Sequence, residues 1–510
     1  MSAASHLSLG GVLLTLSALV PAVLAGALVC RFILREPLRV GLSRGIGVSF
    51  GLGSGLLAWC MMVLLLAGIR LTPVRVLGFV ACCLVILWLV GRALPEPAAQ
   101  SEDSREPALP AWRRALTWLL ALVLASQFAL LLAMTVLVDI IHYDTLNVWA
   151  PRALGIFVQQ TFFAWPATVH GEQPQLVPLV FAWMYGWHGR VADEYVKIVS
   201  AMFVFAATLA SYWALRRRRV PADVALAWCC FGVLAGSWWF SGGCHAYADV
   251  PLSVFLVVGV VMADEWAWTA SWRSLAVAGI AGGLAAFTKL EGNGAWLVIL
   301  AVSCLGVRMA KARGAHGRRV GLTVVVTLVG LWLLTAGLWY GAEARYGTES
   351  YGPQAHFSQL PQLRRLPVIL HEAWLTVSPI ARAGSRGISG ALLGASWFGT
   401  LVVLLAVPFL LVPDAVRRTR AHLLALAIVA LIAISLSPYF STTYPVRVCV
   451  YQAFNRQISQ IQPLLIVFFG LFFWRWLRGE GWIDPYAPGP QASGQRSAAA
   501  GGQQEGGQSG

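Results

Sequence analysis

Charge is what this sequence has least of. Only 12% of its 510 residues are charged, whereas 58% are hydrophobic and the mean hydropathy is +0.70. A soluble core needs far less apolar surface, so these values exclude an ordinary soluble protein and indicate a polytopic membrane protein. The sequence also lacks a Walker loop, a glycine-rich dinucleotide turn and the cysteine pairs of a zinc site. It therefore predicts neither a nucleotide-binding nor a zinc-binding domain.

Acidic residues are scarce compared with basic ones. The chain has 22 Asp and Glu against 37 Lys and Arg, a formal net charge of +15. Such an excess can indicate nucleic-acid binding, but here the basic residues form short clusters between apolar runs, as at Arg216 to Arg219. That distribution is typical of membrane topology and of attraction to anionic lipid headgroups. We expect membrane lipids, and not nucleic acid, as partners.

The nine cysteines fall mostly inside apolar runs, as at Cys82 and Cys83. There they are best interpreted as small apolar fillers. Cys244 and Cys449 lie in polar stretches, where an oxidising compartment would permit a disulfide that their spacing does not demand. No basic residue precedes the first apolar run, so we expect a span there and not a cleaved signal peptide.

Continuous apolar runs predict an all-α polytopic membrane protein with about thirteen transmembrane helices. The runs start near Leu9, Ile46, Val76, Leu116, Val196, Ala222, Ala248, Ser274, Gly294, Val320, Ala391, His422 and Ile461. The run from Pro174 to Trp187 contains two prolines and is too short to cross. We expect it to form a re-entrant or interfacial helix.

This arrangement predicts the sides of the membrane and the domain boundaries. With residues 174–187 not crossing, the basic clusters share the cytoplasmic side, the N-terminus lies outside and the C-terminus inside. Residues 1–94 would form three N-terminal transmembrane helices, 95–110 a cytoplasmic linker, 111–479 a transmembrane catalytic core and 480–510 a disordered cytoplasmic tail.

The first outer loop opens with two carboxylates, a histidine and a tyrosine at the end of an apolar run. Here Asp144 follows His142 and Tyr143. Leu146, Trp149 and Ala153 then recur at helical spacing and predict an amphipathic surface helix. Asp144 could be a general base toward a substrate hydroxyl, or it could simply cap that helix.

A second outer loop repeats this trio of residue types, with His245, Tyr247 and Asp249. Asp249 lies at the mouth of the next span, and a helix cap is again the alternative to a catalytic carboxylate. The repetition favours a polar cavity shared by both loops. His142, His245, Asp144 and Asp249 could also bind a divalent metal, although no ligand pair has a diagnostic spacing.

Two cations arrive on the same predicted side from later parts of the chain. Lys289 lies in a hairpin between spans, and Arg456 lies just before the last span. Either suits the phosphate of a lipid. Lys289 could instead form a local ion pair with Glu291, or extend to the membrane interface.

The order of these motifs resembles the GT-C superfamily of integral-membrane glycosyltransferases, which includes aminoarabinose transferases of lipid A and protein O-mannosyltransferases. The resemblance covers about Leu116 to Arg478. Its motifs are Tyr143-Asp144 with Trp149 and Arg152-Ala153, Gln175 to Leu179 with Trp183, Tyr247 to Pro251, Thr288-Lys289 with Glu291-Gly292, and Arg456 with Pro463. The chain departs from the pattern in lacking an adjacent Asp-Glu pair and in its three extra N-terminal spans.

The resemblance implies an inverting transfer from a polyprenyl-phosphate-linked sugar to a glycan, lipid or protein acceptor, on the outer, periplasmic face of a bacterial-type inner membrane. Asp144 would be the base and Asp249 a second catalytic carboxylate, while Lys289 and Arg456 would hold the phosphate. His142, Tyr143, Arg152, His245, Tyr247 and Glu291 would complete the substrate site. Two alternatives remain at this stage, a lipid-linked sugar transporter or flippase and an O-antigen-type polymerase or ligase, the latter through the late loop with Arg364, Arg365, His356 and His371.

Overall fold

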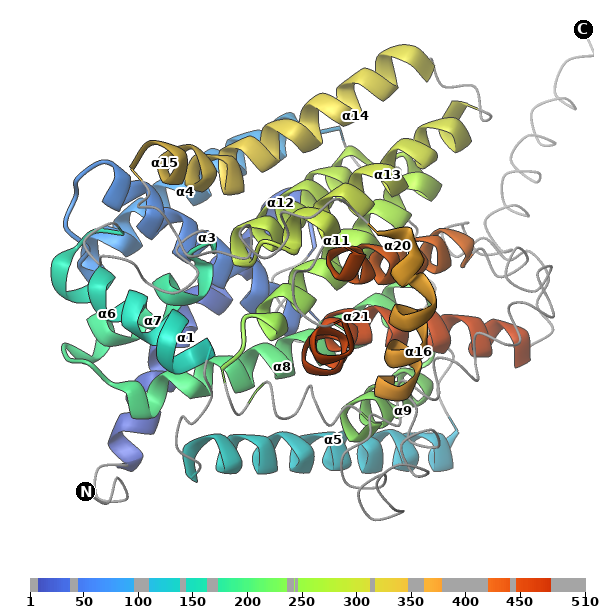
Figure 1. Cartoon of the computed structure of the whole chain (residues 1–510), viewed down its shortest axis with the longest axis horizontal. Coiled ribbons are helices and arrows are strands. Elements are labelled where there is room, and N and C mark those ends of the chain that lie inside the picture. The colour runs from blue at the N-terminus through green and yellow to red at the C-terminus, as the bar shows by residue number, and fades with distance from the viewer. Residues whose placement is uncertain are drawn as a thin grey trace, which may run out of the picture.

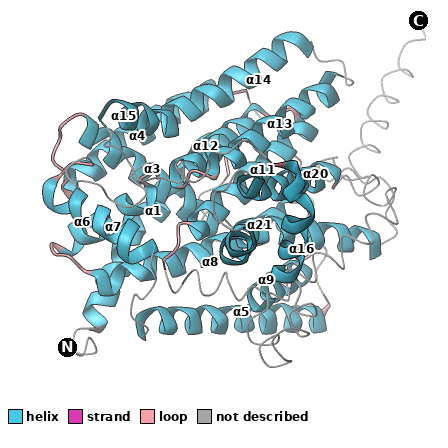
Figure 2. Cartoon of the chain, viewed as in Figure 1, coloured by secondary structure: helices cyan, strands magenta, loops and turns pink. Residues whose placement is uncertain are grey.

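The structure is a computed structural model of the chain, and in its described part every regular element is a helix (Figure 2). The described residues are 8–36, 45–95, 110–137, 144–162, 173–235, 243, 246–311, 317–346, 362–377, 421–440 and 446–477. The expected linker at 95–110 and tail at 480–510 fall almost wholly outside them. Those two boundaries stay predictions.

The main helices follow one another along the chain with short connections. They are α1 (Leu9–Val29), α3 (Ile46–Leu66), α4 (Pro73–Ala93), α5 (Ala111–Leu137), α6 (Ala150–Gln159), α7 (Leu176–His188), α8 (Asp193–Arg217), α9 (Ala222–Ala235), α11 (Asp249–Thr269), α12 (Trp272–Thr288), α13 (Gly292–Lys311), α14 (Gly317–Trp332), α15 (Leu338–Tyr346), α16 (Leu366–Val377), α20 (His422–Leu436) and α21 (Val446–Leu477). Short π-helical segments are η2 (Cys30–Leu34), η3 (Thr145–Trp149) and η4 (Leu333–Gly337), and short 3-10 segments are η6 (Leu363–Arg365) and η7 (Ser437–Phe440).

Ten helices in the described residues are long and apolar enough to cross a membrane, which makes the chain a multi-pass helical membrane protein. The expected count was about thirteen. Of the other three runs, α9 has 14 residues, α12 has 17, and the run starting near Ala391 lies outside the described residues. At 1.5 Å per residue, α9 covers roughly 21 Å, which is less than the thickness of the hydrocarbon core.

Helix α11 forms the centre of the bundle. All of its span is buried, and α8, α12, α13 and α21 pack around it. In Figure 1, α5 lies along the lower edge and α14 along the upper edge, with α11 and α21 between them. The outer helices expose large apolar side chains, for example Leu122 of α5 and Val326 of α14. A polar core with charged helix ends inside an apolar rim is the arrangement expected in lipid.

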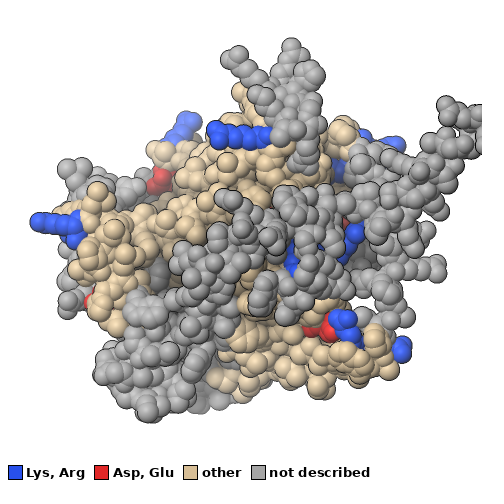
Figure 3. Space-filling model, turned by 90° about the vertical axis from the view of Figure 1, so that its right-hand side faces the viewer, with Lys and Arg blue, Asp and Glu red and all other residues tan. Residues whose placement is uncertain are grey.

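The side of the molecule drawn in Figure 3 carries few charges on its described surface. Lys and Arg side chains occur there at scattered places, and most of the visible described atoms belong to uncharged residues. Such a surface can lie against hydrocarbon without a large desolvation cost.

The N-terminal helices pack closely on one another and on the rest of the bundle. A Cβ added to Gly53 of α3 would lie 1.7 Å from the carbonyl oxygen of Ala22 in α1, so only glycine permits this crossing. The α3 helix also packs on α8, and the indole of Trp183 in α7 donates to the carbonyl of Ala18 in α1 at 2.9 Å. Residues 9–93 are therefore joined to the later helices by direct contacts.

The charged residues distinguish two ends of the bundle. Arg217 and Glu265 form an ion pair that joins the C-terminal ends of α8 and α11, which we call the Arg217 end. Arg273, at the start of α12, donates to the carbonyls of Ile33 and Gly91 at 2.7 and 3.0 Å and so brings the last turns of η2 and α4 to that end. The first residues of α8 and α11 therefore lie at the other end, the Asp249 end.

Helix α7 begins and ends at the Asp249 end. Before it, the side chain of Gln173 accepts a hydrogen bond from Leu290 N at 3.3 Å, and after it the Tyr185 hydroxyl bonds Asp193 at the start of α8. The helix does not traverse the bundle, as its length of 13 residues predicted. It is not a surface helix, however, because residues 176–185 are buried within the protein.

Candidate functional site

Asp249 is the centre of a buried ionic cluster. It is the first residue of α11 and is only 3% exposed. Its Oδ1 accepts hydrogen bonds from Lys289 Nζ at 2.9 Å and from Gln460 Nε2, and its Oδ2 accepts from Arg456 Nη2 at 2.9 Å and Nε at 3.3 Å. A carboxylate has about four acceptor sites, and these four bonds use them all. Asp249 is thus an anchor for both cations and not simply a helix cap.

Lys289 reaches Asp249 because α12 ends at Thr288 and α13 begins at Gly292, which forms the hairpin that the sequence predicted. Its Nζ also lies 3.1 Å from Glu291 Oε1. Burial would lower the pKa of Lys289, but the carboxylates of Asp249 and Glu291 raise it above its ordinary value. The local ion pair with Glu291 is present, and Lys289 joins the distant Asp249 as well.

Arg456 connects the two predicted carboxylates. Its Nη2 lies 2.6 Å from Asp144 Oδ2 and 2.9 Å from Asp249 Oδ2. Its guanidinium also lies over the ring of Tyr247, with its carbon 4.3 Å from the ring centroid, a cation–π contact. Burial raises the pKa of Tyr247, so its hydroxyl stays protonated at neutral pH. The sequence placed Arg456 in a loop, but it lies within the 32-residue helix α21.

Asp144 does not cap a helix. Its φ and ψ of −61° and −39° are helical, and its side chain makes no capping hydrogen bond to η3, which follows it directly. The carboxylate instead contacts Arg456, which is 312 residues away in sequence. The Asp144 side chain is 24% exposed, compared with 4% for Asp249. Of the two carboxylates, Asp144 is the one that a substrate can reach.

The helix after Asp144 is amphipathic, but not quite as predicted. Trp149 and Ala153 are buried at 3% and 0%, whereas Leu146 is 47% exposed. The π-helical turn at Thr145–Trp149 shifts the register, so Thr145 and not Leu146 shares the buried face. The buried face packs on α7 of the same protein. It is therefore not a helix that lies with this face in lipid.

Arg152 joins the site through another residue. It is 6% exposed, and its Nη1 donates to the carbonyl of Gln173 at 3.0 Å. The side chain of Gln173 accepts from the backbone N–H of Leu290, directly after Lys289. Gln173 thus links the helix that follows Asp144 to the hairpin that carries Lys289, and Arg152 supports this link.

Two glutamines of the site were not identified as site residues from the sequence. Gln460 lies four residues after Arg456, so a helix continuing through both would have placed them on one face. Gln173 precedes the α7 motif, and nothing in its local sequence indicates contact with residue 290. Of the predicted residues, His142, Tyr143 and His245 lie outside the described residues, as do the side chains of Cys244 and Cys449.

The described residues contain no group of three His, Cys, Asp or Glu side chains that could hold a metal ion. Within them Asp144 and Asp249 are ion-paired, and both oxygens of Asp249 are occupied by hydrogen bonds. The suggested metal site stays a prediction, because its two histidines, His142 and His245, are not among those residues.

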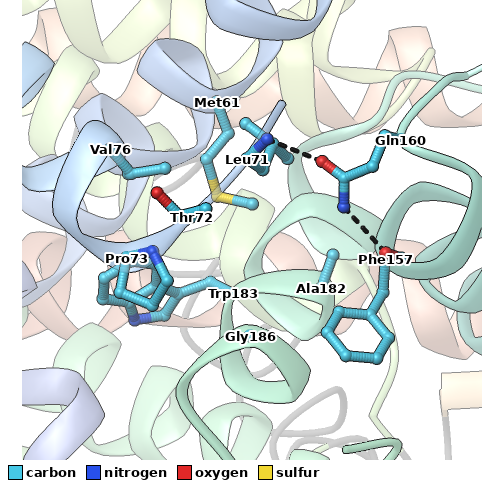
Figure 4. Close-up of a pocket in the computed structure, with 10 residues that line it drawn as sticks. All are labelled: Met61, Leu71, Thr72, Pro73, Val76, Phe157, Gln160, Ala182, Trp183 and Gly186. Carbon is cyan, nitrogen blue, oxygen red and sulfur yellow. Dashed lines mark hydrogen bonds between the residues drawn. The ribbon is translucent and has the colours of Figure 1, made fainter. Parts of the chain in front are cut away.

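A small apolar pocket lies apart from the ionic cluster, between the start of α4 and helices α6 and α7 (Figure 4). Gln160 lines it and is fixed by two hydrogen bonds, from Leu71 N at 2.6 Å and to the carbonyl of Phe157 at 2.7 Å. The pocket's lining includes none of Asp144, Asp249, Lys289 and Arg456. It contributes no charge to the site.

Comparisons of the chain with protein-family models, with curated proteins and with solved structures find no match. The functional argument therefore depends on the chain's own residues. Four of the predicted residues from four separate segments, Asp144, Asp249, Lys289 and Arg456, meet at one end of the bundle. We call these four residues the ionic cluster.

Proposed function

We propose that this protein is a membrane glycosyltransferase that moves a sugar from a polyprenyl-phosphate-linked donor to an envelope glycan, lipid or protein. The observation that carries the proposal is the ionic cluster, in which an accessible carboxylate lies 2.6 Å from a guanidinium beside a second buried cation. A base and a phosphate-holding pair are the two parts that such a transfer requires. The GT-C resemblance supplies the same reaction class.

In this reaction an acceptor hydroxyl attacks the anomeric carbon of the sugar. The new bond forms between the acceptor oxygen and that carbon, and the bond from the carbon to the phosphate oxygen breaks. Asp144 takes the hydroxyl proton, and the polyprenyl phosphate leaves with the bonding electrons. Arg456 and Lys289 stabilise the negative charge that develops on the phosphate, and the sugar is inverted.

Asp249 has a different role from Asp144. With four hydrogen bonds and 4% side-chain exposure, it has no acceptor site left for a substrate hydroxyl. It holds Lys289 and Arg456 at a fixed separation, so the cations need no reorganisation as charge develops. We therefore assign the base to Asp144 and positioning to Asp249.

A transporter for the same lipid is the weaker alternative. Transporters place ionisable residues near the bilayer midplane, in broken helices. In the central helix α11 the acidic residues are Asp249 at its first position and Asp264 and Glu265 near its end, and the turns between are apolar. For the ligase alternative, the described Arg365 bonds Gln362 at 3.1 Å and so offers a less open cation than Arg456.

The proposal is tested with purified protein in nanodiscs, given polyprenyl-phosphate-linked sugars and an envelope extract as acceptor. We expect release of polyprenyl phosphate together with sugar transfer by the parent. Glu194→Gln is the matched control, since Glu194 lies at the same end of the bundle but pairs only with the exposed Arg190 in the described residues. A parent protein that neither binds nor cleaves any such donor would contradict the proposal.

The predicted orientation, with the Asp249 end outside an inner membrane, is part of the proposal. Leu290 is 37% exposed beside the cluster and serves as a reporter position. A cysteine there should react with a membrane-impermeant thiol reagent in cells whose outer barrier has been permeabilised, compared with the parent's own cysteines as background. Labelling only after the inner membrane is opened would place the site on the cytoplasmic side.

A further inference from the structure

Arg456 divides its donors unequally between its partners. One side of the guanidinium, Nε and one N–H of Nη2, is bonded to Asp249. The other N–H of Nη2 goes to Asp144, and within the described part of the chain Nη1 donates to no residue. The end of the guanidinium formed by Nη1 and Nη2 is the edge that binds phosphate in a two-pronged manner. Asp144 occupies half of that edge.

The two carboxylates differ in how firmly they are held. Asp249 receives four hydrogen bonds at 4% exposure, while Asp144 accepts only the one from Arg456 in the described residues and is 24% exposed. Asp144 also sits directly before a π-helical segment, a local geometry that is common at functional sites. Displacing Asp144 breaks one partly exposed ion pair, whereas displacing Asp249 would leave two buried cations unpaired.

The charge balance rules out a phosphate that is simply added to the cluster. Asp144, Asp249 and Glu291 supply three negative charges around the two cations Lys289 and Arg456. A further anion beside three carboxylates would be repelled, because opposite charges must at least balance in a buried site. A phosphate fits if one carboxylate moves away, and Asp144 is the one held least.

We propose that the donor phosphate takes the place of Asp144 on Arg456, so that binding of the donor is what frees the catalytic base. This inference rests on the proposed function and deepens it. Without the donor, the Asp144 carboxylate is tied to a guanidinium and is a poor base. With the phosphate on Arg456, the carboxylate is released about one side-chain length from the anomeric carbon. The donor then binds before the acceptor is activated.

The test measures the binding of a polyprenyl monophosphate without sugar, in nanodiscs made only of phosphatidylcholine so that no anionic lipid competes. Asp144→Asn should bind this probe about tenfold more tightly than the parent, because a competing charge-assisted contact is removed. In an Arg456→Ala background the same Asp144→Asn change should give no gain. The coupling between the two changes is the signature of a shared position.

Glu291→Gln separates displacement from general electrostatics. Glu291 is also a carboxylate of the site, but it pairs with Lys289 and not with Arg456. Any gain from Glu291→Gln should therefore persist when Arg456 is Ala. Unchanged or weaker probe binding by a folded Asp144→Asn protein would overturn the displacement proposal while leaving the transferase proposal standing. Parent protein that does not bind the probe at all would overturn both, and equal gains from Asp144→Asn with and without Arg456 would also reject displacement.

Discussion

The two ends of α11 carry similar charges in different states of saturation. At the Arg217 end, Arg217 pairs with Glu265 and Glu36, and Arg218 pairs with Asp264 at 2.5 Å with both side chains at most 3% exposed. At the Asp249 end, Arg456 and Asp144 are 21% and 24% exposed. Both ends have two cations and three carboxylates, so the number of charges alone does not distinguish them.

The difference lies in what the donors bond. Arg273, beside the Arg217 end, gives its guanidinium donors to four backbone carbonyls, those of Ile33, Gly91, Leu94 and Pro95. These bonds satisfy the last carbonyls of helices and fasten α12 to the N-terminal helices. At the Asp249 end one edge of Arg456 is still available. We infer that the saturated end holds the fold together and the open end performs chemistry.

The largest expected effect is on stability, at the saturated end. Arg218→Ala leaves Asp264 buried without its cation, which should cost about 3–5 kcal/mol of unfolding free energy. Transfer per folded molecule should be unchanged. Thermal unfolding in detergent measures the first quantity and the assay above the second. If Arg218→Ala does not fold, the double change Arg218→Leu with Asp264→Leu should restore folding, since it leaves no unpaired charge. Loss of transfer in the folded double variant would break the division between the two ends.

Removing a cation at the open end should act on donor use instead. Lys289→Ala and Arg456→Ala each lose a charge-assisted contact to the phosphate, worth about tenfold to a hundredfold at low donor concentration. Arg456→Lys should recover only part of this loss, because an ammonium cannot bind with two parallel N–H groups. Initial rates at varied donor concentration measure the effect. Parental donor dependence in both alanine variants would remove the phosphate-holding role.

The smallest expected effect concerns two glutamines of one helix. Gln460 donates to Asp249, while Gln462 donates to the carbonyl of Gly232 at 2.6 Å, on another face of α21. Gln460→Ala should slow transfer several-fold, the scale of one hydrogen bond, by loosening Asp249. Gln462→Ala should leave the rate per folded molecule unchanged. Equal effects of the two changes on that rate would mean that Asp249 does not depend on Gln460.

Much of the site follows from local sequence because span ends are readable. Asp249 begins α11 and Lys289 follows α12, as the ends of the apolar runs indicated. Once the runs alternate in direction, those ends must lie on one side. The meeting of Asp144, Lys289 and Arg456 was therefore predictable as a shared side, although not as direct contacts.

What sequence could not give depends on packing between distant segments. The π-helical turn after Asp144 moved Leu146 out of the buried face, and no periodicity signals such a turn. Whether Asp144 caps its helix or bonds Arg456 depends on the placement of α21, which is set by contacts with α8, α11 and α20. Helix length was misjudged for α9 for the same reason, since its short apolar run is completed by neighbours such as Ile466 of α21 beside Gly232.

The most direct test of the account is the rate of sugar transfer by Asp144→Asn at saturating donor and acceptor. Asn keeps the size of the side chain and can still accept one hydrogen bond from Arg456, so folding and membrane insertion should be preserved. Loss of a general base should lower the rate by roughly a hundredfold or more, while Glu194→Gln stays at the parental rate. Asp249→Asn, measured alongside, should raise the donor concentration needed. A well-folded Asp144→Asn protein that transfers sugar at nearly the parental rate would contradict the assignment of the base, and with it the mechanism built on the ionic cluster.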